Sequence, residues 1–151
     1  MHPNIGKTIG GGFAGTLVMT MMMYLVAPMM GLNMDIAAML GGMLGIGWIG
    51  GMLMHLVNGT IIFPLIYAFA LYSRLPGSPA LKGTTWGVIL WLVAQGVVMP
   101  MMGAGMFSAA MGGMMAAAGS LVGHVLYGAV LGAIAGEAVP TGAPVRSSSR
   151  A

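Results

Sequence analysis

The sequence predicts an all-α protein, a four-helix transmembrane bundle formed from a tandem duplicated helical hairpin. Three observations predict this fold class. Hydrophobic residues make up 58% of the 151 residues and charged residues 5%, a composition typical of membrane proteins and not of soluble domains. The apolar runs are continuous rather than alternating, which indicates helices and not the strands of a barrel. The third observation is an internal repeat.

The repeat relates the two halves of the chain. A shift of 72 positions places the sequence PMMG at 28–31 on PMMG at 100–103, and nine of the fourteen positions from 28 to 41 are then identical. We place the repeats at about 7–72 and 82–139. Because each repeat holds two spans, both halves are expected to enter the membrane in the same direction, related by a pseudo-two-fold axis along the membrane normal.

Four apolar stretches are expected to cross the membrane, since each is long enough for a hydrocarbon core about 30 Å thick. The first is expected to be a retained helix rather than a signal peptide, because no clear Ala-x-Ala cleavage site follows it. The spans form one integral membrane domain, residues 1–139, and a disordered polar tail follows at 140–151. The approximate spans are 9–30, 44–72, 85–102 and 117–138.

The connections within each half, 31–43 and 103–115, are the best-matched parts of the repeat. Both are expected to form short helices at or dipping into the membrane surface. Asp35 is a candidate N-cap of the first, because its carboxylate can accept the free N–H groups of an opening turn, and Ser108 is the corresponding candidate in the second. Residues 75–80, rich in Pro, Gly and Ser, link the two halves.

The basic residues predict the orientation of the bundle. All five lie before the first span, between the second and third, or after the fourth, and the two methionine-rich connections carry none. The positive-inside rule therefore predicts that both termini are cytoplasmic and the methionine-rich connections are outside. The five are Lys7, Arg74, Lys82, Arg146 and Arg150.

Glycines spaced four residues apart predict close packing of the helices. Such spacing places small residues on one helix face, which lets backbones approach closely in lipid. We therefore expect a tight bundle. The pairs and triplet begin at Gly11, Gly47, Gly83, Gly119 and Gly128.

Two histidines inside the spans are candidate ligands. With a shift of 69, His55 and Gly59 fall on His124 and Gly128, so each histidine has a glycine one turn away on its own helix face. A symmetric pair of imidazoles with space cleared by the glycines is a candidate haem b site. Its propionates would point outward, where no Lys or Arg is available. The alternative is that each neutral histidine hydrogen-bonds a neighbouring helix.

Two polar residues three positions after the histidines, Asn58 and Tyr127, are candidates to orient the imidazoles through hydrogen bonds. They could equally satisfy one another.

The methionines are the second candidate ligand set, for Cu(I), because thioethers are soft donors. Four pairs spaced i, i+4 in the outer segments would each place two thioethers on one helix face. The alternative is that methionine fills gaps in an apolar core as a flexible side chain. The pairs are Met30/Met34, Met39/Met43, Met102/Met106 and Met111/Met115.

Several functional classes are excluded or disfavoured. The chain has no cysteine, its only acids are Asp35 and Glu137 on opposite sides, and its few cations are scattered. These features exclude thiol chemistry, disfavour carboxylate-based hydrolysis or proton pumping, and give no indication of nucleic-acid binding. We expect no catalytic activity.

The stretch from Gly15 to Gly31, the Pro-Met-Met-Gly turns and the paired His-x3-Gly elements resemble small uncharacterised bacterial multi-pass membrane proteins. This resemblance implies a place in the inner membrane of a bacterium and no particular activity. The function expected first is that of an accessory or structural subunit, whose partners are the lipid bilayer and other membrane subunits or a second copy. A haem- or copper-binding membrane protein is the alternative, and a small transporter is the second alternative.

Overall fold

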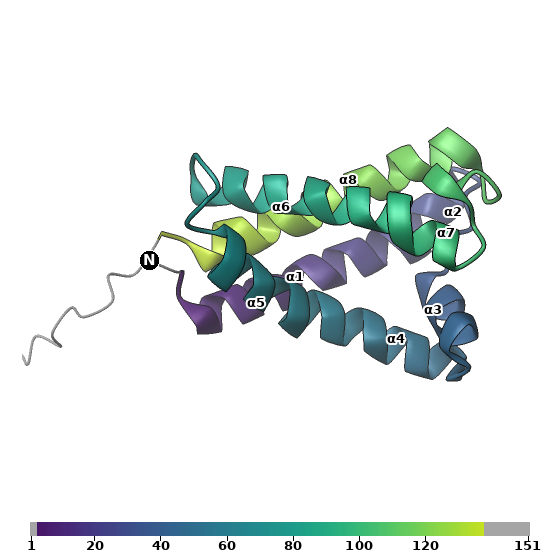
Figure 1. Cartoon of the computed structure of the whole chain (residues 1–151), viewed down its shortest axis with the longest axis horizontal. Helices are drawn as coiled ribbons and strands as arrows, with labels where there is room; N and C mark the ends of the chain where they lie inside the picture. Colours follow the sequence, from purple (N-terminus) through teal and green to yellow (C-terminus); the bar gives the residue numbers. More distant parts are fainter. Residues whose placement is uncertain (1–2, 138–151) are drawn as a thin grey trace, which may run out of the picture.

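The computed structural model describes residues 3–137, and within them the chain is all-helical, without strands. Four helices are long and apolar enough to cross a membrane: Ile5–Met29, Gly47–Leu71, Pro79–Met101 and Gly113–Ala135. The predicted fold class is therefore confirmed. Figure 1 shows the helices running side by side along the long axis of the molecule. The expected polar tail lies outside the described residues.

The first and third long helices share one plan. The first consists of α1 (Ile5–Met21), the π-helical turn η1 (Met22–Val26) and α2 (Ala27–Met29). The third consists of α6 (Pro79–Val93), the π-helical turn η4 (Ala94–Val98) and α7 (Met99–Met101). The π turns and the short helices after them are 72 positions apart in the chain, the same shift that aligns the two PMMG sequences.

The second and fourth long helices differ from each other. The second consists of α4 (Gly47–Val57), the π turn η2 (Asn58–Ile62), α5 (Phe63–Ile66) and a further π turn, η3 (Tyr67–Leu71). The fourth, α8 (Gly113–Ala135), is one uninterrupted α-helix of 23 residues. It begins four residues before the predicted span.

Three prolines explain three of the π turns. Pro28, Pro64 and Pro100 each lie two residues after the end of η1, η2 or η4. In each case the residue before the proline donates its N–H five residues back rather than four, as Phe63 does to Asn58. A proline ring clashes with the carbonyl four residues earlier, and a wider turn relieves that clash.

The two connections within the halves differ. The first contains α3 (Ile36–Leu44), with Asp35 as its N-cap, as predicted. The second contains only a short 3₁₀ turn, η5 (Met106–Ser108), so the predicted helix over 103–115 is wrong. Ser108 has a φ of 56° and donates its hydroxyl to Gln95 instead of capping a helix. Glycines at both ends of the segment adopt positive φ, which interrupts helical geometry.

Glycines bring the helix backbones together, as their spacing predicted. A Cβ on Gly83 would overlap the carbonyl of Gly128, and a Cβ on Gly128 would overlap that of Gly83, so α6 and α8 touch backbone to backbone. A Cβ on Gly15 would come within 2.8 Å of the Tyr127 carbonyl, which brings α1 against α8. A Cβ on Gly51 would overlap the Ala37 carbonyl, which fixes α3 against α4.

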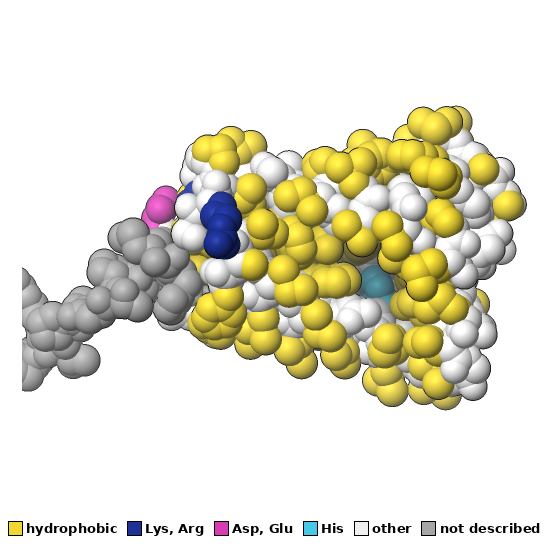
Figure 2. All heavy atoms as spheres, viewed as in Figure 1, with side chains coloured by type: hydrophobic (Ala, Val, Ile, Leu, Met, Phe, Trp, Pro, Cys, Tyr) yellow, Lys and Arg dark blue, Asp and Glu magenta, His cyan; other side chains and the backbone are white. Residues whose placement is uncertain are grey.

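The two ends of the bundle differ in charge. Lys7 near the start of α1, Arg74 just after η3 and Lys82 near the start of α6 lie at one end, which we call the basic end. The described residues of the other end, the methionine-rich end, include no Lys or Arg. The Lys and Arg side chains that are visible in Figure 2 lie toward the left of the molecule, and apolar side chains cover much of the rest of that face. The N-terminal start of α1 and the end of α8 both lie at the basic end (Figure 1).

Packing also differs between the two ends. Toward the basic end, a buried aromatic and aliphatic cluster fills the bundle, and its members include Tyr67, Tyr72, Trp86 and Leu131. Tyr72 donates its hydroxyl to the Gly136 carbonyl at 2.9 Å, which ties the second long helix to the end of α8. Toward the methionine-rich end, α4 diverges from α6 and α8 (Figure 1), and the bundle is hollow there.

Candidate functional site

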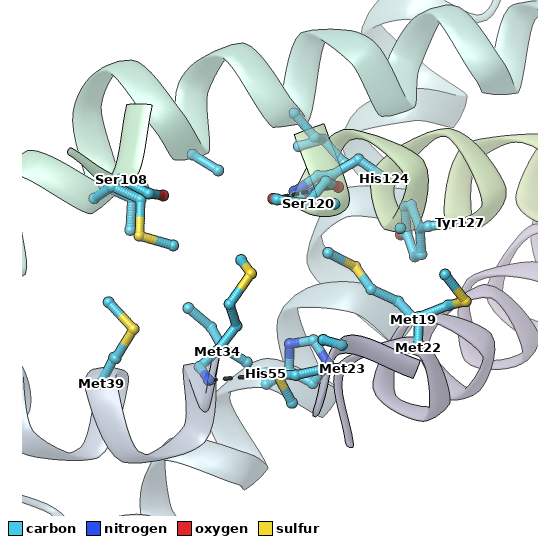
Figure 3. A pocket seen from close by; sticks show the side chains of 18 of the residues that line it. Met19, Met22, Met23, Met34, Met39, His55, Ser108, Ser120, His124 and Tyr127 are labelled. Atoms are coloured by element: carbon cyan, nitrogen blue, oxygen red, sulfur yellow. Dashed lines mark hydrogen bonds between the residues drawn. The ribbon is translucent and has the colours of Figure 1, made fainter. Parts of the chain in front are cut away.

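A cavity of about 260 Å³ occupies the methionine-rich half of the bundle. All four long helices and both connections within the halves contribute to its wall, and both histidines of the spans line it. Figure 2 shows a histidine side chain at the bottom of a hollow between two apolar lobes. In Figure 3, His55 and His124 lie on opposite sides of the pocket, and Met19 and Met34 extend into the space between them.

His55 is oriented by a residue on another helix. Its Nε2 lies 3.1 Å from the hydroxyl of Thr20 on α1. That hydroxyl donates its proton to the Thr16 carbonyl at 2.7 Å, so it acts as the acceptor toward the ring. The proton of a neutral His55 is therefore on Nε2, and Nδ1 carries a lone pair.

His124 is oriented by its own helix. Its Nδ1 lies 2.8 Å from the carbonyl oxygen of Ser120, one turn earlier in α8, and 3.4 Å from the Ser120 hydroxyl. Because a carbonyl can only accept, the proton of neutral His124 is on Nδ1, and Nε2 carries the lone pair.

Each histidine therefore keeps one nitrogen free to bind a ligand. Among residues 3–137, neither Nδ1 of His55 nor Nε2 of His124 has a hydrogen-bond partner. The lining residues include no carboxylate. The cavity thus presents two neutral nitrogen lone pairs in surroundings made mainly of thioethers and aliphatic side chains.

The two glycines near the histidines do not clear space for a porphyrin. A Cβ on Gly59 would overlap the Thr16 hydroxyl, and a Cβ on Gly128 would overlap the backbone of Gly83. The space left by the missing side chains at these two positions is filled by neighbouring helices. The described part of the methionine-rich end also supplies no Lys or Arg for propionates. The residues present do not fit haem.

The two residues that were expected to orient the imidazole rings, Asn58 and Tyr127, do not form hydrogen bonds with them. Tyr127 donates its hydroxyl to the Gly59 carbonyl at 2.7 Å and so does not orient His124. Asn58 lines the cavity and donates its backbone N–H to the His55 carbonyl, but among the described residues no hydrogen bond joins its side chain to the His55 ring. Thr20 and Ser120 take the orienting role instead. Ser120 shares the face of His124 by its i−4 spacing, a signal present in the sequence, whereas nothing in the sequence connects Thr20 with His55.

Methionines form much of the cavity wall, but only some of the predicted ones are among them. Met30, Met34, Met39, Met102 and Met111 line the cavity, whereas Met43, Met106 and Met115 do not. Four methionines outside the predicted pairs also line it: Met19, Met22, Met23 and Met99. These four lie in the long helices, where the i, i+4 pattern of the connections gave no reason to select them.

The i, i+4 pairs were predicted on the assumption that both methionines of a pair lie on one α-helix, and this is true of one pair. Met39 and Met43 both lie in α3. Met34 lies before α3, Met106 lies in the 3₁₀ turn and Met111 lies in a turn, so the other three pairs do not share one α-helix. The methionines meet at the cavity because the chain folds the connections over it, and not because of helix periodicity.

The family to which the chain belongs follows from a sequence match over most of its length. The sequence model of a family of unknown function, DUF6789, matches residues 3–141. The chain belongs to this family. No curated protein matches the chain, and no solved structure matches it.

In this member of the family, a cluster of hydrogen bonds around Asp35 holds α3 beside the cavity. The Asp35 carboxylate accepts from Tyr24 Oη at 2.7 Å, from the Ala38 N–H at 2.9 Å and from Trp48 Nε1 at 3.0 Å. Partial burial alone would raise the pKa of the carboxyl, but these hydrogen bonds together hold the pKa below its usual value. Asp35 thereby joins the first long helix, α3 and α4, and brings Met34 and Met39 to the cavity wall.

Proposed function

We propose that this chain is a non-catalytic membrane protein that binds Cu(I) in the cavity between its two halves. One observation carries the proposal. His55 and His124 line the same methionine-rich cavity, and each has one unprotonated ring nitrogen without a hydrogen-bond partner among residues 3–137. A histidine that served only to join helices would not need to line a cavity.

The chemistry of the wall favours a soft, singly charged ion. Imidazole nitrogens and thioethers suit Cu(I), whereas Mg²⁺ and Ca²⁺ require oxygen ligands that the cavity does not offer. All these donors are neutral. The cost of moving an ion into an apolar region rises with the square of its charge, so a divalent ion without carboxylates would cost about four times as much. Cu(I) prefers soft ligands and carries a single charge, so it suits both the donor atoms and the apolar surroundings of the cavity.

The proposal includes a position in the membrane. We infer that both termini are cytoplasmic and that the cavity lies in the outer half of a bacterial inner membrane. The support is the gathering of Lys7, Arg74 and Lys82 at the end opposite the cavity.

We also infer that the chain arose by duplication of a helical hairpin. The π turns η1 and η4, each followed by a proline, support this origin because they recur at the shift that aligns the sequence.

The test is anaerobic titration of the detergent-purified protein with Cu(I) held by a chromophoric competing chelator. We expect one tightly bound ion per chain. Outer-shell changes cost about 10–100-fold in metal affinity, so removing a ligand should cost at least about 100-fold. His55→Ala and His124→Ala should each show that loss, whereas the control Asn58→Ala, from the same cavity wall, should bind as wild type does.

The other expected functions predict different results. A protein that takes up no Cu(I) at all would overturn the proposal and leave the role of an accessory subunit of a membrane complex, which requires only helix packing. Binding that survives in both histidine variants would also overturn it. Release of the bound ion across the bilayer of sealed proteoliposomes would extend the proposal to transport.

A further inference from the structure

A second cavity lies beside the first, between the first long helix and α8. Its volume is about 190 Å³. Three of its six lining residues are methionines: Met22 from η1, Met30 after α2, and Met115 from the first turn of α8. Ala118, Gly119 and Val122 complete the wall. Three thioethers therefore converge on one small space whose other walls are apolar.

The two cavities share part of their walls. Met22, Met30 and Gly119 line both. Gly119 has no side chain to separate the two spaces. The two shared methionines can therefore turn toward either cavity, because a methionine side chain has three rotatable bonds.

Two of the methionines that line the second cavity are exposed. Met30 is 58% exposed and Met115 is 61% exposed, whereas both histidines are partly buried in the bundle. Met115 lines the second cavity and not the first. Met115 and Met30 are therefore the exposed methionines of the second cavity.

We propose that Met22, Met30 and Met115 form a loading site for Cu(I), a site that rests on the proposed function of the histidine cavity. The ion binds to the three thioethers and then exchanges ligands. Met115 is released, Met22 and Met30 stay in contact, and the free imidazole nitrogens complete the transfer. No electron or proton moves in this step, because all the ligands are neutral and the ion stays Cu(I). Thioethers are the soft ligands that select this ion.

Neighbouring methionines provide matched controls. Met29 is 86% exposed and Met114 is 71% exposed, and neither lines either cavity. Each is the chain neighbour of a proposed ligand. Replacement of methionine by leucine conserves size and apolar character and removes only the sulfur, so such variants are expected to fold.

The experiment measures the rate and the affinity of Cu(I) loading separately. Stopped-flow mixing of the protein with the Cu(I)–bicinchoninate complex gives the rate from loss of the complex's colour, and the end point gives the affinity. We expect Met115→Leu to slow loading by at least about tenfold, which corresponds to about 1.4 kcal/mol in the barrier, with the end point unchanged. Met114→Leu should load at the wild-type rate. Met30→Leu should slow loading and also weaken the end point, because Met30 lines both cavities, whereas Met29→Leu should do neither.

The failure of this inference differs from the failure of the proposed function. Equal loading rates for Met115→Leu and Met114→Leu, with tight binding in both, would overturn the loading site and leave the histidine site intact. A wild-type protein that binds no Cu(I) would overturn both. If an acyl chain of a lipid fills the second cavity instead, Met115→Leu loads like its control, which is the first of these results.

Discussion

At the scale of single residues, the two neutral histidines each keep one ring nitrogen free, but they do so in opposite tautomers and through different partners. His55 depends on a hydroxyl of another helix, and His124 depends on a backbone carbonyl of its own helix. A side-chain substitution can remove the first partner but not the second. The sequence duplicates the histidines, yet the structure does not duplicate what orients them.

This difference predicts unequal effects of two substitutions. Thr20→Val keeps the shape of the side chain and removes the acceptor for His55 Nε2, so we expect Cu(I) affinity to fall by about 10–100-fold. Ser120→Ala removes only the 3.4 Å contact and leaves the carbonyl bond at 2.8 Å, so we expect less than about a threefold change. The chelator titration measures both, and equal losses would contradict the assignment of roles.

The hydrogen bonds around Asp35 predict a dependence of stability on pH. The pKa of Asp35 is lowered in the folded protein, so its contribution is complete above the ordinary aspartate pKa of about 3.9 and is lost as pH falls further. Asp35→Ala removes an N-cap and should cost about 1 kcal/mol at neutral pH. Glu137 is the only other acidic side chain, so few other groups titrate in this range. Unfolding curves of the wild type and of Asp35→Ala in detergent should therefore differ at pH 7 and converge toward pH 3. A constant difference across that range would contradict this role.

At the scale of elements, proline leaves a carbonyl without its helical donor, and another helix supplies one. In η2, the Phe63 N–H donates to Asn58, and Pro64 has no N–H for the next carbonyl, that of Gly59. Tyr127 of α8 donates its hydroxyl to this carbonyl in a buried bond. In a hydrocarbon environment such a carbonyl requires a partner, so the π turn determines where α8 contacts the second long helix.

We expect Tyr127→Phe to destabilise the protein by about 1–3 kcal/mol, the cost of a buried acceptor left unpaired. Pro64→Ala restores an N–H near the same carbonyl, so the effect of Tyr127→Phe should be smaller in that background. A double-mutant cycle of unfolding free energies in detergent measures the coupling. Strict additivity would show that the tyrosine hydroxyl and the proline act independently.

The glycine contact between α6 and α8 predicts a position-specific response to alanine. Gly128→Ala places a methyl group into the backbone of Gly83, and overpacking of this kind costs about 1–3 kcal/mol. Gly10→Ala on α1 meets nothing within 4 Å and should stabilise the helix by up to about 1 kcal/mol. Thermal unfolding of both variants in the same detergent checks the contrast in sign.

The elements could be predicted from the sequence to different degrees. The long apolar runs identified all four membrane helices, because length and hydropathy decide this feature. The second connection was predicted as a helix because it repeats the residues of the first. Its structure differs because four glycines adopt positive φ: Gly103, Gly105, Gly112 and Gly113. Sequence identity to the first connection does not reveal these backbone conformations. The position of Asp35 was predictable since capping is local.

At the scale of the whole molecule, the distribution of charge predicts a simple topology. The chain has no native cysteine, so single cysteines report accessibility without background. We expect a membrane-impermeant maleimide to label Met114→Cys in intact cells, or in spheroplasts where an outer membrane intervenes. Pro76→Cys, at the basic end, should react only after the inner membrane is permeabilised. The opposite pattern would reverse the proposed orientation and place the cavity toward the cytoplasm.

The candidate site was only partly predictable because it is a property of the whole fold. The sequence pointed to His55 and His124 because ionisable residues in a membrane are costly. It did not point to Thr20, Met19 or Met22, which join the site only when α1 packs across the other helices. The space that the haem hypothesis required is absent for the same reason, since Gly59 and Gly128 face other helices rather than open space.

The divergence of α4 from α8 has a consequence for the surrounding lipid. The basic half is filled by an aromatic and aliphatic cluster, while the methionine-rich half contains a cavity, so we expect the protein to take up more area in one leaflet than in the other. Lateral pressure in the leaflet that holds the wider half of the protein favours a conformation with a narrower cavity. A change in that pressure alters the relative free energies of the wide and narrow conformations and so shifts their populations. Ligand affinity should therefore vary with bilayer composition even when every residue of the protein is unchanged.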